Sequence, residues 1–242
     1  MSIWVVMPSC RPVTEAEDCL SRWRKMGYKI AVLRQGSPVQ ADLHLPAAEY
    51  AGWGRAINLL AKDVLRLDPA ASWIVGAADD YWPDPEALPE RIAQDCQLHF
   101  ASASDRHGLF GVMQPTGDRW GDTQSTRNTF GEDRGAEIDR IAGSPWMGRE
   151  WCERAYQGKG PMPDCYRHLY IDEELQEVAT KLGVFWQRRD LIQYHNHPCR
   201  KEGYEVYGKG HLAPLYSPEA WTKERTLFES RKAAGFLGSE PL

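Results

Sequence analysis

Short apolar runs recur along the first eighty residues of the chain, and amphipathic stretches separate them. The runs at residues 3–7, 29–33 and 73–75 predict buried strands, and residues 42–46 predict a further short one. Small or polar residues follow each run and indicate where each strand ends. Strand, helix and strand in this order, with short connections, are typical of a parallel sheet, so we expect an α/β fold.

The amphipathic stretches predict helices. Thr14 is placed to cap the first helix, which runs to Met26 and ends at Gly27. The second begins at Gly54, and Asp84 is placed to cap the third. The core-facing positions predicted for the second helix are Ile57, Leu60, Val64 and Leu65. Further helices are predicted over residues 85–96, 148–155, 171–182 and 218–233.

The pattern weakens in the middle of the chain. Residues 109–115 predict a strand, and residues 118–135 are so polar that they predict a long loop of a length that is commonly functional. Extended segments are expected again at 184–186 and 191–194. Within the polar loop, phosphate or nucleic-acid contacts are one interpretation, and a solvated loop is the other, for Arg119, Arg127 and Arg134.

The composition is that of a globular protein. The chain has 242 residues, of which 42% are hydrophobic and 26% charged. The formal net charge of −5 argues against a protein that coats nucleic acid non-specifically, although it leaves room for a local basic groove. Ten tryptophans suit either a core or a platform on which rings stack.

The six cysteines form no C-x-x-C pair, so we do not expect a structural zinc site. Free thiols in a reducing cytoplasm are the simplest interpretation of their spacing. The apolar run at residues 3–7 is too short to span a membrane. We therefore expect a cytoplasmic protein without integral membrane contact.

Two adjacent carboxylates, Asp79 and Asp80, follow the strand predicted at residues 73–75. Ligands of open α/β sheets bind at the carboxyl ends of the strands. Carboxylate oxygens at that edge suit Mg²⁺ or Mn²⁺ holding a diphosphate. A solvated turn is the alternative, but the order of the preceding elements favours the metal site.

Three acidic residues, Asp172, Glu173 and Glu174, open the helix predicted over residues 171–182. Acidic side chains in a first turn complement the helix dipole, which accounts for Glu173 and Glu174. Asp172 is predicted to be the N-cap, where it would face the space before the helix. A carboxylate at such a position can act as general base toward an acceptor hydroxyl. The residues expected to face the core are Leu175, Val178, Ala179 and Leu182.

Two histidines, His195 and His197, end the last predicted extended segment. Residues two apart on an extended chain point to the same side. One of these imidazoles could complete a metal shell or contact a phosphate, and the alternative is that both are ordinary surface histidines.

In their order and spacing, these parts resemble the GT-A family of nucleotide-sugar glycosyltransferases, most of all its inverting type-2 group, over roughly residues 3–198. Val5-Val6-Met7-Pro8-Ser9 matches the strand and loop that cradle the nucleotide base. Gly54-Arg55-Ala56-Ile57-Asn58 is similar to the family's G-x-x-x-A-x-N helix near uridine and ribose. Residues 74–80 look like the strand and D-x-D metal site, with Ala78-Asp79-Asp80 in place of Asp-x-Asp. Ile171-Asp172-Glu173-Glu174-Leu175 is similar to the E-D-x-E-L helix start, with Ile171 replacing its first Glu.

The resemblance implies a Rossmann-like, mixed and mainly parallel sheet flanked by helices, and a metal-dependent glycosyltransferase. The cofactor would be Mn²⁺ or Mg²⁺, and the donor a nucleotide sugar, with a UDP-sugar as the expected one. Asp172 would be the base of an inverting displacement, and the metal ligands would be Asp80 with His195 or His197. The donor-binding residues that it implies are Pro8, Ser9, Arg11, Arg55, Asn58 and Asp79.

The same resemblance predicts a GT-A domain over residues 1–200, with a nucleotide-binding half (1–98) and an acceptor and catalytic half (99–200), and a C-terminal extension (201–242). The acceptor could be a glycan, a protein or a modified, hydroxymethylated DNA base. The oligomeric state stays open. Two other functions also stay open. One is a nucleotidyltransferase of related fold, for which Ser9-Cys10-Arg11-Pro12 is a poor phosphate loop. The other is a non-catalytic sugar- or nucleic-acid-binding protein, which the missing Glu at position 171 keeps open.

Overall fold

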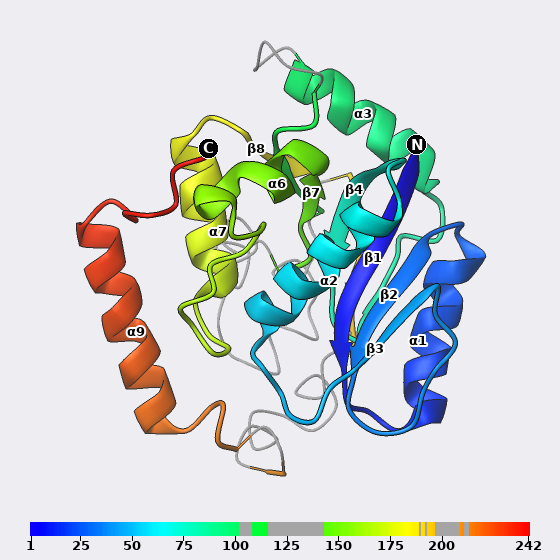
Figure 1. Cartoon of the computed structure of the whole chain (residues 1–242), viewed down its shortest axis with the longest axis horizontal. Coiled ribbons are helices and arrows are strands. Elements are labelled where there is room, and N and C mark those ends of the chain that lie inside the picture. Colours follow the sequence, from blue (N-terminus) through cyan, green and yellow to red (C-terminus); the bar gives the residue numbers. More distant parts are fainter. Residues whose placement is uncertain (102–107, 116–142, 189, 192, 197–208, 211–212) are drawn as a thin grey trace.

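A seven-stranded mixed sheet forms the centre of the protein in the computed structural model (Figure 1). The structure describes residues 1–101, 108–115, 143–188, 190–191, 193–196, 209–210 and 213–242. In spatial order the strands are β3 (Leu43–Pro46), β2 (Lys29–Arg34), β1 (Ser2–Ser9), β4 (Ala71–Gly76), β7 (Trp146–Gly148), β6 (Val112–Pro115) and β8 (Phe185–Arg188).

Most of the strand pairings in this sheet are parallel. The four strands β3, β2, β1 and β4 pair in parallel, as do β6 and β8, while β7 runs antiparallel to both of its neighbours. The predicted α/β class with a mixed, mainly parallel sheet is therefore confirmed. A separate pair of short strands, β5 (Tyr81–Trp82) and β9 (Tyr194–His195), runs antiparallel beside the main sheet.

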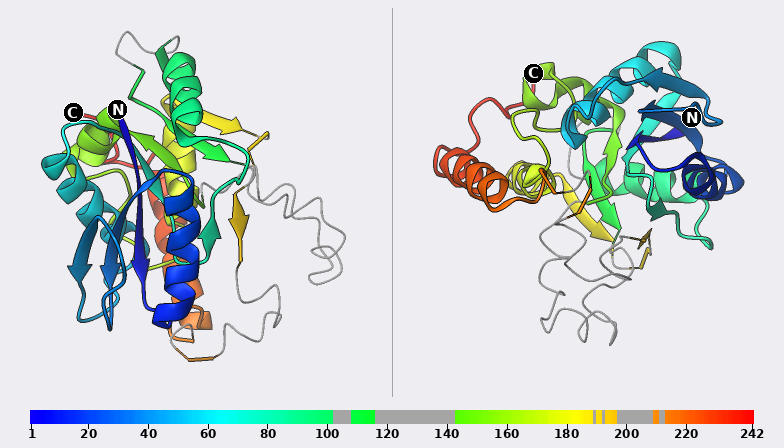
Figure 2. Two further views of the ribbon diagram at one scale, coloured as in Figure 1. Left: turned by 90° about the vertical axis from the view of Figure 1, so that its right-hand side faces the viewer. Right: turned by 90° about the horizontal axis from the view of Figure 1, so that it is seen from below.

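Helices cover both faces of the main sheet (Figure 2). One face carries α1 (Val13–Lys25) and α3 (Pro89–Ala101), and the other carries α2 (Trp53–Leu67), α6 (Arg149–Gly158) and α7 (Ile171–Lys181). A strand that is buried on both faces needs apolar side chains at every position, which explains why β1 and β4 read as continuous apolar runs. On β1 the side chains alternate between the two cores: one takes Ile3, Val5 and Met7, and the other Trp4 and Val6.

Two of the predicted helix starts are wrong. α1 begins directly after Pro12 with no side-chain cap, so Thr14 lies inside the first turn. α3 begins later than predicted, at Pro89. The reason is local: Asp84 Oδ1 accepts a hydrogen bond from the backbone N–H of Glu86 at 2.9 Å and forms a turn of its own. Proline, with its fixed φ, is then well suited to open the helix.

The polar segment between β6 and β7 lies largely outside the described residues. Residues 116–142 belong to it, so Arg119, Arg127 and Arg134 receive no structural account. His197 lies outside the described residues as well. Among the residues that are described, no helix is long and apolar enough to cross a membrane.

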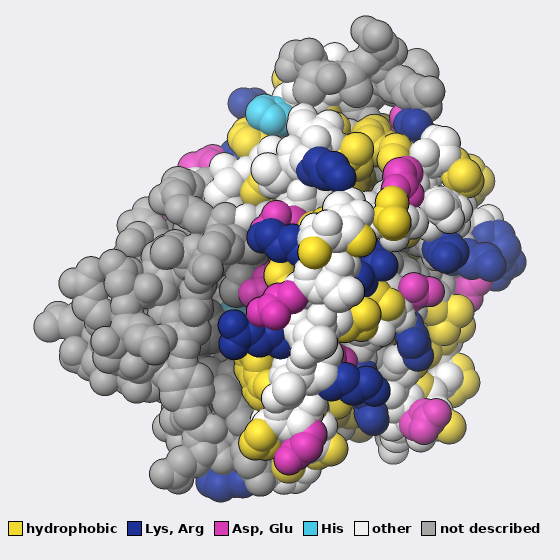
Figure 3. Space-filling view, turned by 90° about the vertical axis from the view of Figure 1, so that its left-hand side faces the viewer, with side chains coloured by type: hydrophobic (Ala, Val, Ile, Leu, Met, Phe, Trp, Pro, Cys, Tyr) yellow, Lys and Arg dark blue, Asp and Glu magenta, His cyan; other side chains and the backbone are white. Residues whose placement is uncertain are grey.

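The last helix, α9 (Pro218–Ala233), lies outside α7 and is joined to it by side chains (Figure 1). Arg231 forms a bidentate ion pair with the fully buried Glu174 of α7, with N···O distances of 2.7 and 2.6 Å. Tyr166 Oη donates to the same carboxylate at 2.7 Å. Figure 3 shows the outer face of α9, where basic and acidic side chains are interspersed. Leu182, predicted to face the core, follows α7 and is 38% exposed.

Replacing Arg231 with Met should lower the free energy of unfolding by about 3 kcal/mol, because it leaves the buried Glu174 carboxylate without its counter-charge. Urea denaturation measures the loss. The matched control is Arg225→Met on the same helix, which breaks an exposed pair with Glu229 and should change stability little. Equal losses in the two variants would contradict the role given to the buried pair.

Candidate active site

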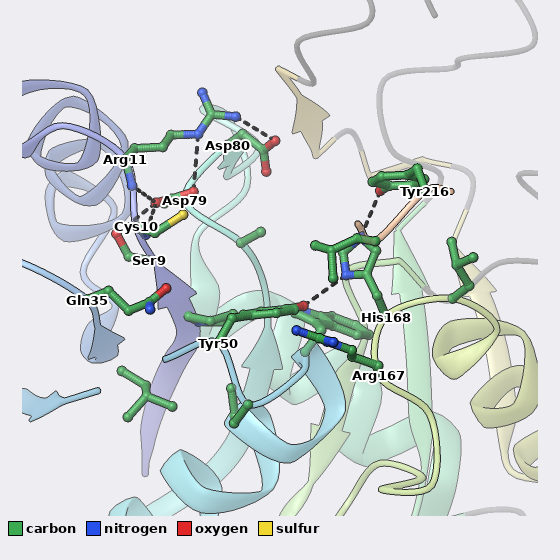
Figure 4. A pocket seen from close by; sticks show the side chains of 18 of the residues that line it. Ser9, Cys10, Arg11, Gln35, Tyr50, Asp79, Asp80, Arg167, His168 and Tyr216 are labelled. Atoms are coloured by element: carbon green, nitrogen blue, oxygen red, sulfur yellow. Dashed lines mark hydrogen bonds and ion pairs between the residues drawn. The ribbon is translucent and has the colours of Figure 1, made fainter. Parts of the chain in front are cut away.

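A cavity of about 870 Å³ opens at the carboxyl edge of the parallel strands (Figure 4). Parallel strands end at the same edge, so the loops after β1, β2, β3 and β4 all reach its wall. The start of α7, the segment before it and the start of α9 also contribute to the wall. The residues predicted for the site that line this cavity are Pro8, Ser9, Arg11, Asp79, Asp80, Asp172 and His195.

Asp79 anchors the loop that follows β1. Its Oδ2 accepts hydrogen bonds from Ser9 Oγ at 2.7 Å and from the backbone N–H groups of Cys10 and Arg11 at 3.2 and 3.3 Å. Burial raises the pKa of Asp79, while the hydrogen bond from Ser9 and the charge of Arg11 act in the opposite direction. The contacts of Asp79 therefore fix the shape of the loop.

Asp80 lies against His195. Pairing of β5 with β9 sets Tyr81 opposite His195, and their rings stack with centroids 4.0 Å apart. The pairing brings His195 Nε2 to 3.5 Å from Asp80 Oδ2. Asp80 is only 7% exposed. Two residues far apart in the sequence thus present a carboxylate and an imidazole to the same corner of the cavity.

This pair is chemically suited to a divalent cation. Carboxylate oxygen and imidazole nitrogen together suit Mn²⁺, and Mg²⁺ also accepts the carboxylate. Over the described part of the chain, no group of three or more His, Cys, Asp or Glu converges on one metal position. Cations that bind phosphates usually keep waters and substrate oxygens as further ligands, so Asp80 and His195 fit a cation shared with a bound diphosphate.

Arg34 stabilises the loop after β1 through hydrogen bonds from its guanidinium. Its guanidinium is buried and donates to Ser9 Oγ at 2.5 Å, to Arg11 O at 2.9 Å and to Ser37 O at 2.6 Å. The main chain of Arg11 is therefore fixed on both sides, by Arg34 at its carbonyl and by Asp79 at its N–H. The sequence offered no signal for Arg34, since an arginine at a strand end is usually a solvated residue.

Asp172 was predicted to be the N-cap of α7, but this prediction is wrong: Asp172 is the second residue of the helix. The N-cap is Tyr170, whose φ of +63° is left-handed and which makes no side-chain cap. Asp172 is half-buried and lines the cavity. Burial raises the pKa of its carboxyl, while the backbone N–H groups of Asp172 and Glu173 and the imidazole of His195 oppose the rise. A carboxylate with a raised pKa at a cavity wall is suited to accept a proton.

The structure does not bring Arg55 and Asn58 to the cavity. Arg55 Nε donates to the backbone oxygen of Asp164 at 2.8 Å. The amide of Asn58 exchanges two hydrogen bonds of 2.9 Å with the backbone of Met162. An added Cβ at Gly54 would lie 2.6 Å from a backbone oxygen of this same loop. The glycine and asparagine of the helix motif thus dock α2 against the loop that precedes α7.

A chain of three polar aromatic side chains crosses the cavity wall (Figure 4). Tyr50 Oη lies 2.9 Å from His168 Nδ1, and His168 Nε2 lies 2.8 Å from Tyr216 Oη. Burial raises the pKa of Tyr50 far above its ordinary value. The chain links the loop after β3 to the segments before α7 and α9, three parts of the sequence that no local pattern connects.

Glu224 of α9 fixes the same wall. Its carboxylate accepts hydrogen bonds from the backbone N–H groups of Arg167 at 2.6 Å, His168 at 3.2 Å and Leu169 at 2.5 Å. Trp221, one turn earlier on the helix, lines the cavity and is 44% exposed. The end of the chain therefore helps to build the site.

The fold has counterparts among solved structures. The mannosyltransferase PcManGT from Pyrobaculum calidifontis, in complex with GDP-Man and Mn²⁺, is 15% identical with a TM-score of 0.53, over 98% of this chain and 76% of that chain. The catalytic domain of Drosophila β1,4-galactosyltransferase 7, in complex with xylobiose, is 12% identical with a TM-score of 0.46, over 82% of this chain and 71% of that chain.

No protein-family model matches the chain, and the comparison with curated proteins gives no match either. At these identities the likeness to PcManGT shows the fold alone. The chain has the fold of the GT-A glycosyltransferases, as the order of its sequence motifs predicted.

Proposed function

We propose that the chain is a metal-dependent glycosyltransferase, which moves a sugar from a nucleotide-diphosphate sugar to an acceptor hydroxyl. One observation carries the proposal: a single cavity at the carboxyl edge of a GT-A sheet holds Asp80, His195 and Asp172. PcManGT was solved with GDP-Man and Mn²⁺, which supports a nucleotide sugar and a divalent cation as the ligands of this cavity too. A UDP-sugar is the donor proposed from the sequence resemblance.

The donor side of the cavity is the loop after β1. Ser9 and Arg11 are held there by Asp79 and Arg34, so the loop is preorganised before a ligand arrives. Asp80 and His195 would hold the cation. When bound, Mn²⁺ or Mg²⁺ supplies charge neutralisation to the departing diphosphate. Guanidinium groups bind phosphate oxygens well, which supports Arg11 as a donor-binding residue.

Asp172 is the proposed base. It would take the proton of the acceptor hydroxyl while that oxygen attacks the anomeric carbon and the bond to the diphosphate breaks, which inverts the anomeric centre. Its raised pKa makes it a stronger base than a solvated aspartate. The electrostatic influence of His195 on Asp172 supports placing the proton acceptor close to the cation side of the cavity.

The wall beside Asp172 favours a carbohydrate acceptor. Tyr170, Tyr216 and the partly exposed Trp221 line the cavity there. Aromatic faces with polar edges suit the mixed apolar and hydroxyl surface of a sugar ring. We therefore propose a glycan as acceptor ahead of a protein or a modified DNA base.

A reducing, cytoplasmic setting is part of the proposal. The described cysteines Cys10, Cys19, Cys96, Cys152 and Cys165 are all free thiols, which a reducing compartment favours.

A thermal-shift panel tests the proposed function. UDP-, GDP- and TDP-sugars are each added with Mn²⁺ and, as the control, with Mn²⁺ replaced by a chelator. A true donor at a hundredfold its Kd should stabilise the fold by about 2.7 kcal/mol, or roughly 5–10 °C for a chain of this length. The shift should need the metal. A panel in which no nucleotide sugar raises Tm would contradict the proposal.

A further inference from the structure

The guanidinium of Arg11 neutralises the carboxylate pair of the cavity (Figure 4). Its Nε lies 3.2 Å from Asp79 Oδ1, and its Nη2 lies 2.9 Å from Asp80 Oδ2. Both carboxylates are about nine-tenths shielded from solvent. Two buried carboxylates this close need a counter-charge, and Arg11 supplies it.

The arginine and a metal ion held together with His195 would both approach the same oxygen. Asp80 Oδ2 is the atom that contacts Arg11 Nη2, and it is also the atom that lies 3.5 Å from His195 Nε2. A cation held by Asp80 and His195 would be repelled by a guanidinium in contact with that oxygen, because both carry positive charge in a poorly solvated site. The guanidinium and the cation therefore cannot both bind Asp80 Oδ2 at full strength at the same time.

The Arg11 side chain can leave without disturbing the loop. Its main chain is fixed independently, since its N–H donates to Asp79 and its carbonyl accepts from Arg34. Its side chain is 21% exposed, and Glu15 on the open side lies 3.6 Å from Nη1, with a 57% exposed side chain. A second partner is thus already in place for a guanidinium that turns away from Asp80.

We propose that Arg11 is a built-in competitor of the metal: its guanidinium and the divalent cation occupy the Asp80 carboxylate alternately, so that Arg11 sets the affinity of the site for the cation. This inference rests on the metal site of the proposed function. Exchange of this kind keeps the carboxylate pair charge-compensated in both states, and it turns the guanidinium toward the open cavity only when the cation is bound.

Mn²⁺ binding to the whole chain, measured by calorimetry without any nucleotide, tests the proposal. Arg11→Gln should bind Mn²⁺ about tenfold more tightly than the wild type, since the competing charge is gone. Arg11→Lys should lie between the two, because an ammonium cannot bridge both carboxylates as a guanidinium does. The control is Arg66→Gln, which removes one positive charge from an exposed pair with Asp63 on α2 and should leave Mn²⁺ affinity unchanged.

Different results would overturn the competition and the metal site. Equal or weaker Mn²⁺ binding by Arg11→Gln would overturn the competition. If Arg11→Gln does not fold, Arg11→Lys, which keeps the charge, is tested in its place. Mn²⁺ binding by Arg11→Lys that is equal to or weaker than that of the wild type would then overturn the competition. Adding Asp80→Asn to the arginine variant should abolish the binding. If Asp80→Asn abolishes Mn²⁺ binding but Arg11→Gln does not bind Mn²⁺ more tightly than the wild type, the competition is overturned and the metal site is retained. Where Mn²⁺ alone binds to no variant, the same titrations are repeated with UDP present, and no Mn²⁺ binding there by any variant would overturn the metal site itself.

Discussion

Replacing Asp172 with Asn is expected to lower kcat/KM for sugar transfer about a thousandfold, with Mn²⁺-dependent donor binding kept. Asparagine has nearly the same shape but cannot accept the acceptor's proton, and general-base catalysis contributes on the order of 10²- to 10⁴-fold. The change leaves both side chains of the Asp80–His195 pair in place, so the donor should still bind. Steady-state transfer kinetics and donor calorimetry on the same preparation measure the two effects.

The matched control for Asp172 is Glu177→Gln. It removes one negative charge from the same helix, at a half-exposed ion pair with Lys232 outside the cavity. This variant should transfer sugar at close to the wild-type rate. If Asp172→Asn also keeps its turnover, Asp172 is not the base, whatever its position.

The pH profile gives a second signature of Asp172. Burial raises the pKa of its carboxyl above the ordinary 3.8. Only the ionised form is a base, so kcat/KM should fall as the pH falls through the raised pKa, at a higher pH than a solvated aspartate would show. Residual activity of Asp172→Asn should lack this acidic limb. A limb that persists in the variant would assign the titration to another group.

Replacing Asp80 with Asn is expected to weaken Mn²⁺ binding roughly a hundredfold or more and to remove the metal requirement from any donor binding that remains. The change deletes the charge that pairs with His195 and leaves Asp79 to hold the loop after β1. Mn²⁺ calorimetry and thermal shifts with and without donor measure it.

The matched control for Asp80 is Asp63→Asn, which removes an equal charge from an exposed pair with Arg66 on α2. It should bind Mn²⁺ as the wild type does. Unaltered Mn²⁺ affinity in Asp80→Asn would place the metal elsewhere. Loss of Mn²⁺ binding in Asp63→Asn as well would point to a general effect of charge.

The fold could be predicted because its central strands carry strong local signals. β1 and β4 are buried on both faces and therefore apolar at nearly every position, and the helices between the strands have one apolar side. Helix starts were less predictable, since they depend on a few hydrogen bonds. Asp84 could cap a helix or close a turn, and the hydrogen bond that it accepts from the backbone N–H of Glu86 shows that it closes a turn.

The site could be predicted only in part, for a physical reason. Asp79, Asp80 and Asp172 lie at element ends, where the sequence order itself indicates an edge of the sheet. The contact of Asp80 with His195 depends on the pairing of β5 with β9, two strands too short to have a pattern. Arg34 could not be predicted, because its three hydrogen bonds depend on tertiary packing.

The contribution of the C-terminal helix to the site was the hardest part to predict from the sequence. α9 was predicted as a helix within an extension, yet Glu224 binds three backbone N–H groups of the cavity wall and Trp221 lines the cavity. Arg231 joins the same helix to α7, which carries Asp172. None of these contacts has a periodic signal, because each joins segments that lie far apart along the chain. The division of the chain at residue 200 stays a prediction.

The proposed function requires that this cavity binds a nucleotide sugar through a divalent cation at Asp80. A calorimetric titration measures this binding, using the nucleotide sugar that stabilises the chain most in the thermal-shift panel. We expect saturable one-site binding in the presence of Mn²⁺ and binding weaker by at least about tenfold when Mn²⁺ is chelated. Equal affinity with and without the metal, or no saturable binding by any nucleotide sugar in its presence, would contradict it.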